Sequence, residues 1–305
     1  MDPPGLRARV GTPPARRLLR AGPRAASAAP PASVVTVHDL GYEHFPAAHP
    51  RLQGWYLRLT TRWHVLAARA LLADSKATRD DLVARYRADP AKITVVYPGI
   101  DPEHFQPVGD PAAVAAVQAR YELPQRYFLY VGTLQPRKNL ARLIEAFAAV
   151  ASPDPELGLV LAGQRGWLYE GLVAHTRRLG LEGRVHFPGY VPDQALPALL
   201  SGAVAFVYPS LFEGFGLPIL EAQACRTPVL TSTTSSCPEV AGEAALLVPP
   251  TDVAAITAGL RRLLTEPGLR MSLVERGAAN VTRFTWAQAA AATLAVLEGT
   301  GDPDS

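Results

Sequence analysis

The sequence predicts an α/β protein with parallel sheets, divided into an incomplete first domain and a complete second domain. Short, continuously apolar segments alternate with longer helical segments, a pattern typical of parallel strands covered by helices on both faces. The second half of the chain contains six such strands and the first half only three. A length of 305 residues is sufficient for two domains of this kind.

The partial first domain is expected over residues 34–108. A β-branched run over 33–37 predicts its first strand, which ends before His38-Asp39. Further strands are predicted at 70–73 and 93–97, and helices at 55–68 and 75–86, the second capped by Asp74 or Ser75. The proline-rich stretch over 102–111 is predicted to be a linker.

The second domain is expected over residues 109–283, where strands and helices alternate regularly. Its strands are predicted at 127–131, 157–162, 185–187, 205–208, 229–231 and 245–248. Its helices are predicted at 140–150, 167–179, 193–203, 218–225, 253–264 and 269–283. A last helix over 286–297 belongs to a crossover helix and tail assigned to 284–305.

The composition excludes several classes of protein. Hydrophobic residues make up 48% and charged residues 19%, which argues against a disordered chain. Outside residues 1–33 the chain has 24 basic and 26 acidic side chains, so a broad nucleic-acid-binding face is not expected. Cys225 and Cys237 provide no disulfide framework or zinc cluster and are interpreted as reduced thiols of a cytosolic protein. No apolar run is long enough to span a membrane.

Residues 1–33 differ from the rest of the chain. They contain seven Pro, eight Ala and six Arg, and they lack the apolar core of a secretory signal. The prolines prevent a long helix. We therefore expect a disordered basic arm or a segment that is not native to the fold.

The most informative segment is the strand–loop–helix string from Tyr208 to Ala222. Gly214 and Gly216 allow the backbone to approach a ligand closely, and Pro218 occupies the expected first position of the helix. The free N–H groups of such a helix start bind anions. Its G-x-G-x-x-I pattern lacks the third Gly of the dinucleotide fingerprint and follows a late strand, so a nicotinamide or flavin site is not expected.

Two carboxylates, Glu213 in the loop and Glu221 in the first turn of the helix, lie eight residues apart in this string. Carboxylates next to phosphates would repel them, because both groups are negatively charged. The two glutamates are therefore better suited to accept hydrogen bonds from sugar and ribose hydroxyls. Taken singly, each also fits a structural role, Glu213 as a solvated loop residue and Glu221 as a carboxylate favoured by the helix dipole.

A basic pair, Arg137-Lys138, follows the first strand of the second domain. Adjacent cations at this edge of a sheet neutralise a diphosphate, one through a planar fork and one as a point charge. A solvated basic pair is the alternative. It is less favoured because cations at a helix N-terminus oppose the dipole, so their position requires a nearby anion.

Three segments resemble the retaining glycosyltransferases of family 4, which have the GT-B fold of two Rossmann-like domains. They are VGTLQPRKNLARLIEAF, YPSLFEGFGLPILEAQACRTPVL and PEVAGEAALLVPPTD. The likeness extends from Val34 to about Leu297. Its final helix, with a Thr285-x-x-Gln288 capping box, resembles the one that crosses back onto the first domain.

The resemblance implies roles for individual residues. Arg137 and Lys138 would bind the donor pyrophosphate, Glu213 would lie by the transferred sugar, and Glu221 by the ribose. His38, in a segment like the family's active-site histidine, would face the sugar, with Asp39 orienting it. The set of implied catalytic residues is His38, Arg137, Lys138 and Glu213. The implied donor-binding set adds Gly132, Thr133, Tyr190, Val191, Gly214, Phe215, Gly216, Leu217 and Glu221.

The sequence also departs from the family pattern. Arg226 replaces a common Gly after the helix, and Thr233-Thr234 replaces a stretch that often contains Asn. The strand, Gly-rich loop and helix with which family members open are not recognisable before His38. We therefore expect an N-terminally truncated first domain.

The function implied is hexosyl transfer from a nucleoside-diphosphate sugar, with GDP-mannose favoured, to a glycan or lipid-linked acceptor in cell-surface polysaccharide synthesis. The nucleotide sugar is the co-substrate, and no cofactor, metal or nucleic acid is expected. The location implied is the cytoplasm, including peripheral contact with the inner face of the membrane. Two alternatives remain: a catalytically impaired nucleotide-sugar-binding fragment, or another GT-B enzyme such as a sugar-nucleotide epimerase or a phosphorylase.

Overall fold

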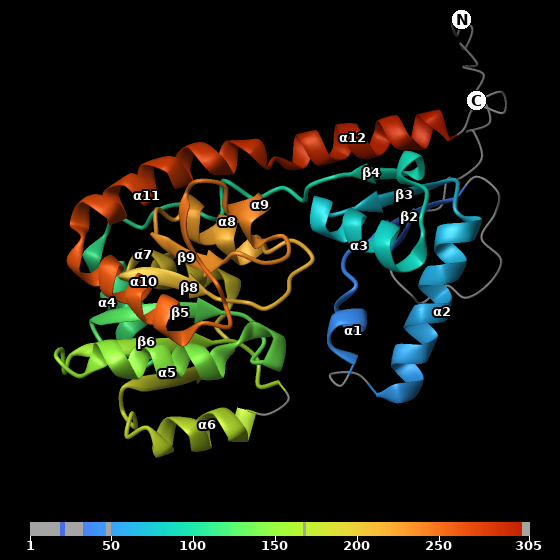
Figure 1. The fold of residues 1–305 in the computed structure, drawn as a ribbon. Helices are drawn as coiled ribbons and strands as arrows, with labels where there is room; N and C mark the ends of the chain where they lie inside the picture. The colour runs from blue at the N-terminus through green and yellow to red at the C-terminus, as the bar shows by residue number, and fades with distance from the viewer. Residues whose placement is uncertain (1–18, 22–32, 47–49, 167–168, 301–305) are drawn as a thin grey trace, which may run out of the picture.

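The computed structural model describes residues 19–21, 33–46, 50–166 and 169–300, which form two lobes, each built on a parallel sheet (Figure 1). The larger lobe has six strands in the order β10-β9-β8-β5-β6-β7. They are β5 (Arg126–Val131), β6 (Leu157–Ala162), β7 (Val185–Gly189), β8 (Ala205–Tyr208), β9 (Val229–Ser232) and β10 (Ala245–Val248). The six strands predicted for this half of the chain are therefore confirmed.

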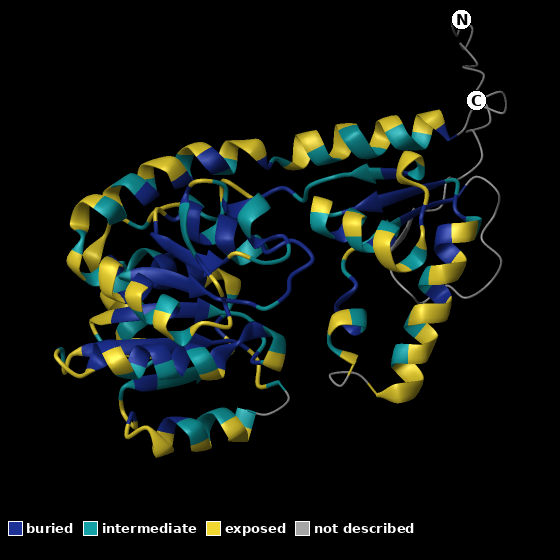
Figure 2. Cartoon of the chain, in the orientation of Figure 1, coloured by how far each residue is buried: buried dark blue, intermediate teal, exposed yellow. Residues whose placement is uncertain are grey.

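Helices cover both faces of this sheet, so its central strands are fully buried, as their continuous apolar sequences require (Figure 2). The helical segments of the lobe are α4 (Pro111–Arg120), η3 (Pro136–Lys138), α5 (Leu140–Ala151), α6 (Tyr169–Arg178), η4 (Asp193–Ala195), α7 (Leu196–Ser201), α8 (Leu217–Ala224), α9 (Cys237–Ala241), α10 (Val253–Thr265) and α11 (Pro267–Asn280). The two residues 167–168, predicted as the start of α6, lie outside the described residues.

Two helices of this lobe were not predicted. Helix α4 begins inside the expected linker, where the Asp110 side chain accepts a hydrogen bond from Ala112 N at 2.9 Å and Pro111 occupies the first turn. This is a strong helix start signal. The signal was missed because the closely spaced prolines were interpreted as a linker. Helix α9 has only five residues, too few for a recognisable apolar period.

The smaller lobe has the strand order β1-β2-β3-β4. Its elements are β1 (Leu19–Ala21), β2 (Val34–Val37), α1 (Gly41–His44), α2 (Arg51–Ala67), β3 (Ala70–Ala73), α3 (Lys76–Tyr86), η2 (Pro90–Lys92) and β4 (Ile93–Val95). Of the two predicted caps of α3, Asp74 and Ser75, the structure has Ser75, which accepts a hydrogen bond from Thr78 N.

Strand β1 differs from the expectation that no part of residues 1–33 belongs to the fold. It pairs in parallel with β2, with Leu19 opposite Val34. A three-residue strand on a sheet edge carries too little apolar pattern to be recognised within an Arg- and Pro-rich segment. The remaining residues of 1–32 lie outside the described part of the chain.

The chain returns to the smaller lobe through η5 (Val281–Arg283) and α12 (Trp286–Gly299) (Figure 1). The predicted capping box at the start of α12 is confirmed, since Gln288 N donates to Thr285 Oγ1 and Thr285 N donates to the Gln288 side chain. Val296 and Leu297 pack against the apolar cluster that Val34, Ala70 and Leu72 form on the smaller sheet. The terminal helix therefore joins the lobes. None of the helices in the described ranges is long and apolar enough to cross a membrane.

Candidate active site

The sheet of the larger lobe reverses its strand order between β5 and β8. In open parallel sheets, ligands bind outside the carboxyl ends of the strands at such a reversal, because the two following loops separate and leave a crevice. Here these loops are 132–139 and 209–216. They are the two segments that the sequence singled out, so the topology places both at one edge of the sheet.

The loop after β8 leads directly into α8. Gly216 precedes the helix with φ 107°, a left-handed conformation that favours glycine. Leu217 is the first helical residue and Pro218 the second, so the predicted first position of Pro218 is wrong by one residue. The backbone N–H groups at this helix start remain the anion-binding feature expected from the sequence.

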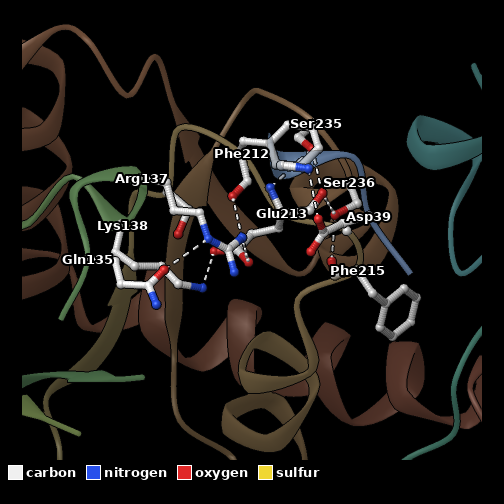
Figure 3. Close-up of polar contacts among 12 residues, drawn as sticks. Asp39, Gln135, Arg137, Lys138, Phe212, Glu213, Phe215, Ser235 and Ser236 are labelled. Atoms are coloured by element: carbon white, nitrogen blue, oxygen red, sulfur yellow. Dashed lines mark hydrogen bonds and ion pairs between the residues drawn. The ribbon is translucent and has the colours of Figure 1, made fainter. Parts of the chain in front are cut away.

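Two serines from the segment before α9 hold the loop in place (Figure 3). Ser236 Oγ donates to the Phe215 carbonyl at 2.7 Å and lies 3.0 Å from the Glu213 carbonyl, which Ser235 Oγ also approaches at 2.5 Å. These serines were not anticipated, because nothing in the local sequence links them to a loop about twenty residues earlier. They fix the backbone on either side of Gly214.

Arg137 and Lys138 converge on Glu213 (Figure 3). Lys138 Nζ lies 2.6 Å from Glu213 Oε1, and Arg137 Nη1 lies 3.1 Å from Glu213 Oε2. Lys138 Nζ also donates to the Tyr208 hydroxyl at 2.7 Å. The sequence predicted an anion near the basic pair, and the carboxylate of Glu213 is such an anion within the protein itself.

The charges of this cluster are strongly coupled. Burial alone raises the pKa of Glu213, but the charges of Lys138 and Arg137 outweigh it and leave the pKa below its usual value. Burial lowers the pKa of Lys138, and Glu213 opposes that effect. Glu213 is therefore a carboxylate at neutral pH. With Arg137 and Lys138 charged, the three side chains have a net charge of +1, which favours an anionic ligand.

At Gly214 the two lobes are in close contact. A β-carbon at this position would clash with the His38 carbonyl and with the Asp39 side chain. Thr78 Oγ1 lies 3.3 Å from both the His38 carbonyl and the Gly214 carbonyl, so it bridges the lobes. Only glycine permits this approach, which brings the end of β2 next to the loop that carries Glu213.

His38 is half exposed at this junction, and its partner is not the one expected. Its Nδ1 lies 2.7 Å from Asp74 Oδ2. This hydrogen bond is the main reason that the pKa of His38 is raised. The interpretation that Asp39 orients the histidine is wrong: Asp39 Oδ1 accepts a hydrogen bond from the N–H of Gly41, the first residue of the short helix α1, at 2.8 Å. The end of β3, rather than the next residue in sequence, positions the imidazole.

Four of the residues assigned to donor binding lie outside the loop after β8 and line one cavity. Gly132, Thr133, Tyr190 and Val191 line a space of about 290 Å³ beside the reversal of strand order. Asp193 lines it as well. The cavity has room for a nucleobase and part of a ribose, and it lies at the same sheet edge as the basic pair.

Glu221 is the fifth residue of α8, so it lies in the second turn rather than the predicted first. Burial, reinforced by the charge of Asp193, raises the pKa of Glu221 to about 7. Asp193 lines the cavity, whereas Glu221 is not among the lining residues. A carboxylate in this environment gains from a hydroxyl donor, which agrees with the hydroxyl-binding role suggested by the sequence.

Glu239 makes several polar contacts between the lobes, and sequence reasoning missed it. Its carboxylate accepts hydrogen bonds from Lys76 N at 2.8 Å and from the Tyr97 hydroxyl at 2.6 Å. The first bond satisfies a free N–H at the start of α3 in the other lobe. The motif PEVAGEAALLVPPTD contained the residue, but no local pattern connects it to a helix 163 residues away.

Among the described residues, no group of three or more His, Cys, Asp or Glu side chains is arranged to hold a metal ion. Both cysteines are free and buried.

Two lobes with parallel sheets, a terminal helix that recrosses between them and a cationic site where their loops meet define a GT-B glycosyltransferase. The chain belongs to the family described as glycosyl transferases group 1, which it matches over residues 117–280, and residues 15–104 match the description Glycosyltransferase Family 4. The second match begins before β1, which agrees with the pairing of that strand in the sheet.

Named relatives agree with this assignment. The chain is 34% identical to O-antigen chain mannosyltransferase B of Escherichia coli over 86% of its own length and 69% of the relative. It is 36% identical to D-inositol 3-phosphate glycosyltransferase of Salinispora tropica over 73% of its length, but it spans only 49% of that protein. The solved structure of WaaG, a glycosyltransferase involved in lipopolysaccharide biosynthesis, matches with a TM-score of 0.74 at 22% identity, covering 93% of this chain and 77% of WaaG.

Proposed function

We propose that this protein is a retaining glycosyltransferase that moves a hexose from a nucleoside-diphosphate sugar to a glycan or lipid-linked acceptor. The observation that carries the proposal is the convergence of Arg137, Lys138 and the loop around Gly214 at the reversal of strand order, beside a separate cavity of nucleoside size. A diphosphate joins a nucleoside to a sugar, so the donor needs cations between two neutral pockets. The basic pair and the cavity beside it supply the diphosphate and nucleoside parts of this order.

The residues present suit departure of a nucleoside diphosphate. Arg137, Lys138 and the N–H groups at the start of α8 stabilise negative charge as the bond between the anomeric carbon and the phosphate oxygen breaks. In a front-face reaction, the acceptor hydroxyl attacks from the side on which the diphosphate leaves, and its proton passes to the departing phosphate oxygen. Glu213 and His38 flank the sugar, and Glu221 receives a ribose hydroxyl. Arg137 and Lys138 take the part that a metal plays elsewhere, so we expect EDTA to leave turnover unchanged.

The donor proposed is GDP-mannose. Two relatives that are 34% identical to this chain have mannosyltransferase in their names, one from Escherichia coli and one from Mycolicibacterium hassiacum.

The relative from Escherichia coli is named as acting on an O-antigen chain, so we propose a cell-surface polysaccharide or its lipid-linked precursor as acceptor. We also propose a cytoplasmic location at the inner face of the membrane, where Cys225 and Cys237 would remain reduced.

A donor panel combined with calorimetry tests the proposal. GDP-mannose, GDP, UDP-glucose and UDP are titrated into the parent chain, into Lys138→Ala and into Lys76→Ala, whose side chain is exposed on α3. We expect Lys138→Ala to weaken binding of the diphosphates by about tenfold, the loss of one charge-assisted contact. Lys76→Ala should bind like the parent. Equal affinity of Lys138→Ala and the parent would contradict the assigned role, and a preference for UDP-sugars would contradict the donor.

A further inference from the structure

Phe212 is a buried aromatic residue in the loop after β8 that the core of its own lobe does not cover. It is only 5% exposed, yet among the described residues it is not part of the apolar clusters built on the two sheets. A large apolar side chain that is buried outside these clusters must be covered by other groups. For Phe212 that cover comes from the smaller lobe.

His44, the last residue of α1, provides this cover. Its imidazole stacks on the Phe212 ring with 4.2 Å between centroids and 28° between the ring planes. Gly41, the first residue of α1, lies beside the same ring, since a β-carbon built on it would be 3.7 Å from Phe212 Cε1. Figure 1 shows α1 on the side of the smaller lobe that faces the larger lobe. Both ends of this short helix therefore lie against the loop after β8.

The imidazole of His44 is fixed in orientation by two partners on α3. Nε2 lies 2.7 Å from Asp81 Oδ2, and Nδ1 lies 3.2 Å from Arg85 Nη2. An arginine can only donate, so Nδ1 accepts and the ring proton is on Nε2, where it donates to Asp81. Asp81 also pairs with Arg85 at 3.3 Å. Turning the imidazole would break the bonds at both ring nitrogens, which keeps its face against Phe212.

The backbone around Phe212 contacts the basic pair. The Phe212 carbonyl accepts a hydrogen bond from Arg137 Nη1 at 3.2 Å (Figure 3), and Leu211 N donates to the Arg137 carbonyl at 2.8 Å. The next residue, Glu213, pairs with the same nitrogen of Arg137 at 3.1 Å. The position of Phe212 therefore helps to set the direction in which Arg137 presents its guanidinium.

We propose that His44 is a positioning residue for the diphosphate site: by stacking on Phe212, it holds the loop after β8 in the conformation in which Arg137 binds a diphosphate. The smaller lobe thus contributes to diphosphate affinity, although the basic pair lies in the larger lobe. The inference rests on the role proposed above for Arg137 and adds a residue that acts through Phe212.

The alternative is that the stack only stabilises the contact between the lobes. The geometry favours positioning, because Phe212 contacts the imidazole through its ring and the guanidinium of Arg137 through its carbonyl. If His44 were replaced by a small side chain, the ring would move into the space left behind. That movement would turn the backbone at Phe212 and displace the carbonyl that holds Arg137.

Nucleotide binding by the full chain in a double-mutant cycle tests the proposal. The variants are His44→Ala, His44→Phe, Arg137→Gln and the combination of His44→Ala with Arg137→Gln. His175→Ala is the matched control, because His175 also has a carboxylate and an arginine partner, Glu145 at 3.1 Å and Arg178 at 3.0 Å, but on α5 and α6. The ligands are GDP and UDP, measured by calorimetry, and guanosine and uridine, measured by ligand-observed NMR. Thermal unfolding confirms that each variant folds.

We expect His44→Ala to weaken diphosphate binding by about fivefold, part of the loss caused by removing Arg137, and to leave nucleoside binding unchanged. His44→Phe keeps a ring on Phe212 and should bind within about twofold of the parent. Because His44 acts through Arg137, His44→Ala should cause no further loss in the Arg137→Gln background. His175→Ala should match the parent.

Equal losses for diphosphates and nucleosides would indicate a general loosening of the lobes and would overturn the proposal. So would additive losses in the double variant, or a His44→Phe variant as weak as His44→Ala. A parent chain that bound neither GDP nor UDP would refute the proposed function and this inference with it. A parent that binds GDP no better than His44→Ala would refute this inference alone.

Discussion

Lys138 Nζ lies 2.6 Å from a carboxylate oxygen of Glu213, and both side chains are almost completely buried. The pair joins the loops that follow β5 and β8, 75 residues apart. The basic pair thus has an internal counter-ion before any ligand arrives. An incoming diphosphate would share these cations with Glu213, so the cluster sets both the shape of the empty site and its affinity for phosphate.

Replacing Glu213 by Gln separates these two effects. Two cations without their counter-ion should bind GDP more tightly, by about fivefold to tenfold, measured by calorimetry. Breaking a buried ion pair should lower the free energy of unfolding by about 3 kcal/mol, measured by chemical denaturation. Glu43→Gln removes a more exposed pair with Arg58 and should cost less than about 1 kcal/mol. Weaker GDP binding by Glu213→Gln would show that the carboxylate assists, rather than competes with, the diphosphate.

Asp74→Asn should lower the pKa of His38, because the hydrogen bond to Asp74 is the main cause of its raised value. A histidine whose pKa is raised by folding adds stability below its unfolded pKa, and this contribution disappears as pH rises through the folded pKa. The stability difference between parent and Asp74→Asn should therefore be larger at pH 5.5 than at pH 8.5. NMR titration of the imidazole measures the pKa directly. Asp39→Asn should shift it less, since Asp39 bonds to Gly41 N instead.

Glu221→Gln should flatten the pH dependence of stability in the absence of ligand. Burial raises the pKa of Glu221 to about 7, so ionising it costs more in the folded chain than in the unfolded chain. The free energy of unfolding of the parent should fall as pH rises from about 4.5 to about 7, and Glu221→Gln should lack that decline. Denaturation at pH 5 and pH 8 measures the difference, with Glu243→Gln at an exposed position as the control. Identical slopes in parent and Glu221→Gln would refute the burial argument.

Glu239→Ala should loosen the contact between the lobes. The substitution removes the acceptor for Lys76 N at the start of α3 and for the Tyr97 hydroxyl. We expect a loss of about 1–2 kcal/mol in unfolding free energy, comparable to the loss of a helix cap. A larger radius of gyration in small-angle scattering would report the separation. Glu239→Gln keeps an acceptor oxygen and should retain most of the stability, so an equal loss in both variants would point to charge rather than to the cap.

Arg226→Gly should stabilise the protein. Arg226 follows α8 with φ 57°, in the left-handed region where a β-carbon is unfavourable. The gain should be about 0.5–1 kcal/mol, seen as a higher midpoint in thermal unfolding. Arg226→Ala retains the β-carbon and should give no gain. A gain of equal size in both variants would assign the effect to the arginine side chain instead of the backbone.

The sequence by itself determined the structural features that depend on residues close together in the chain. The six strands of the larger lobe and the Thr285–Gln288 capping box follow from apolar runs and short spacings, and both were predicted. The cap of α3 was narrowed to Asp74 or Ser75, and the structure has Ser75. The glycine loop and the basic pair were likewise recognisable, because each is a contiguous motif at the end of a strand. Helix α4 was missed although its start signal was present, since the prolines were interpreted only as breaks.

The tertiary structure alone decided which residues meet. Asp74 rather than Asp39 bonds to His38, Glu213 closes an ion pair with Lys138, and Glu239 caps a helix in the other lobe. These partners are separated by 36, 75 and 163 residues along the chain. A strand or a cap is stabilised by contacts within a few residues, so its pattern is local. A site between two lobes is stabilised by contacts that exist only after both sheets have formed and docked.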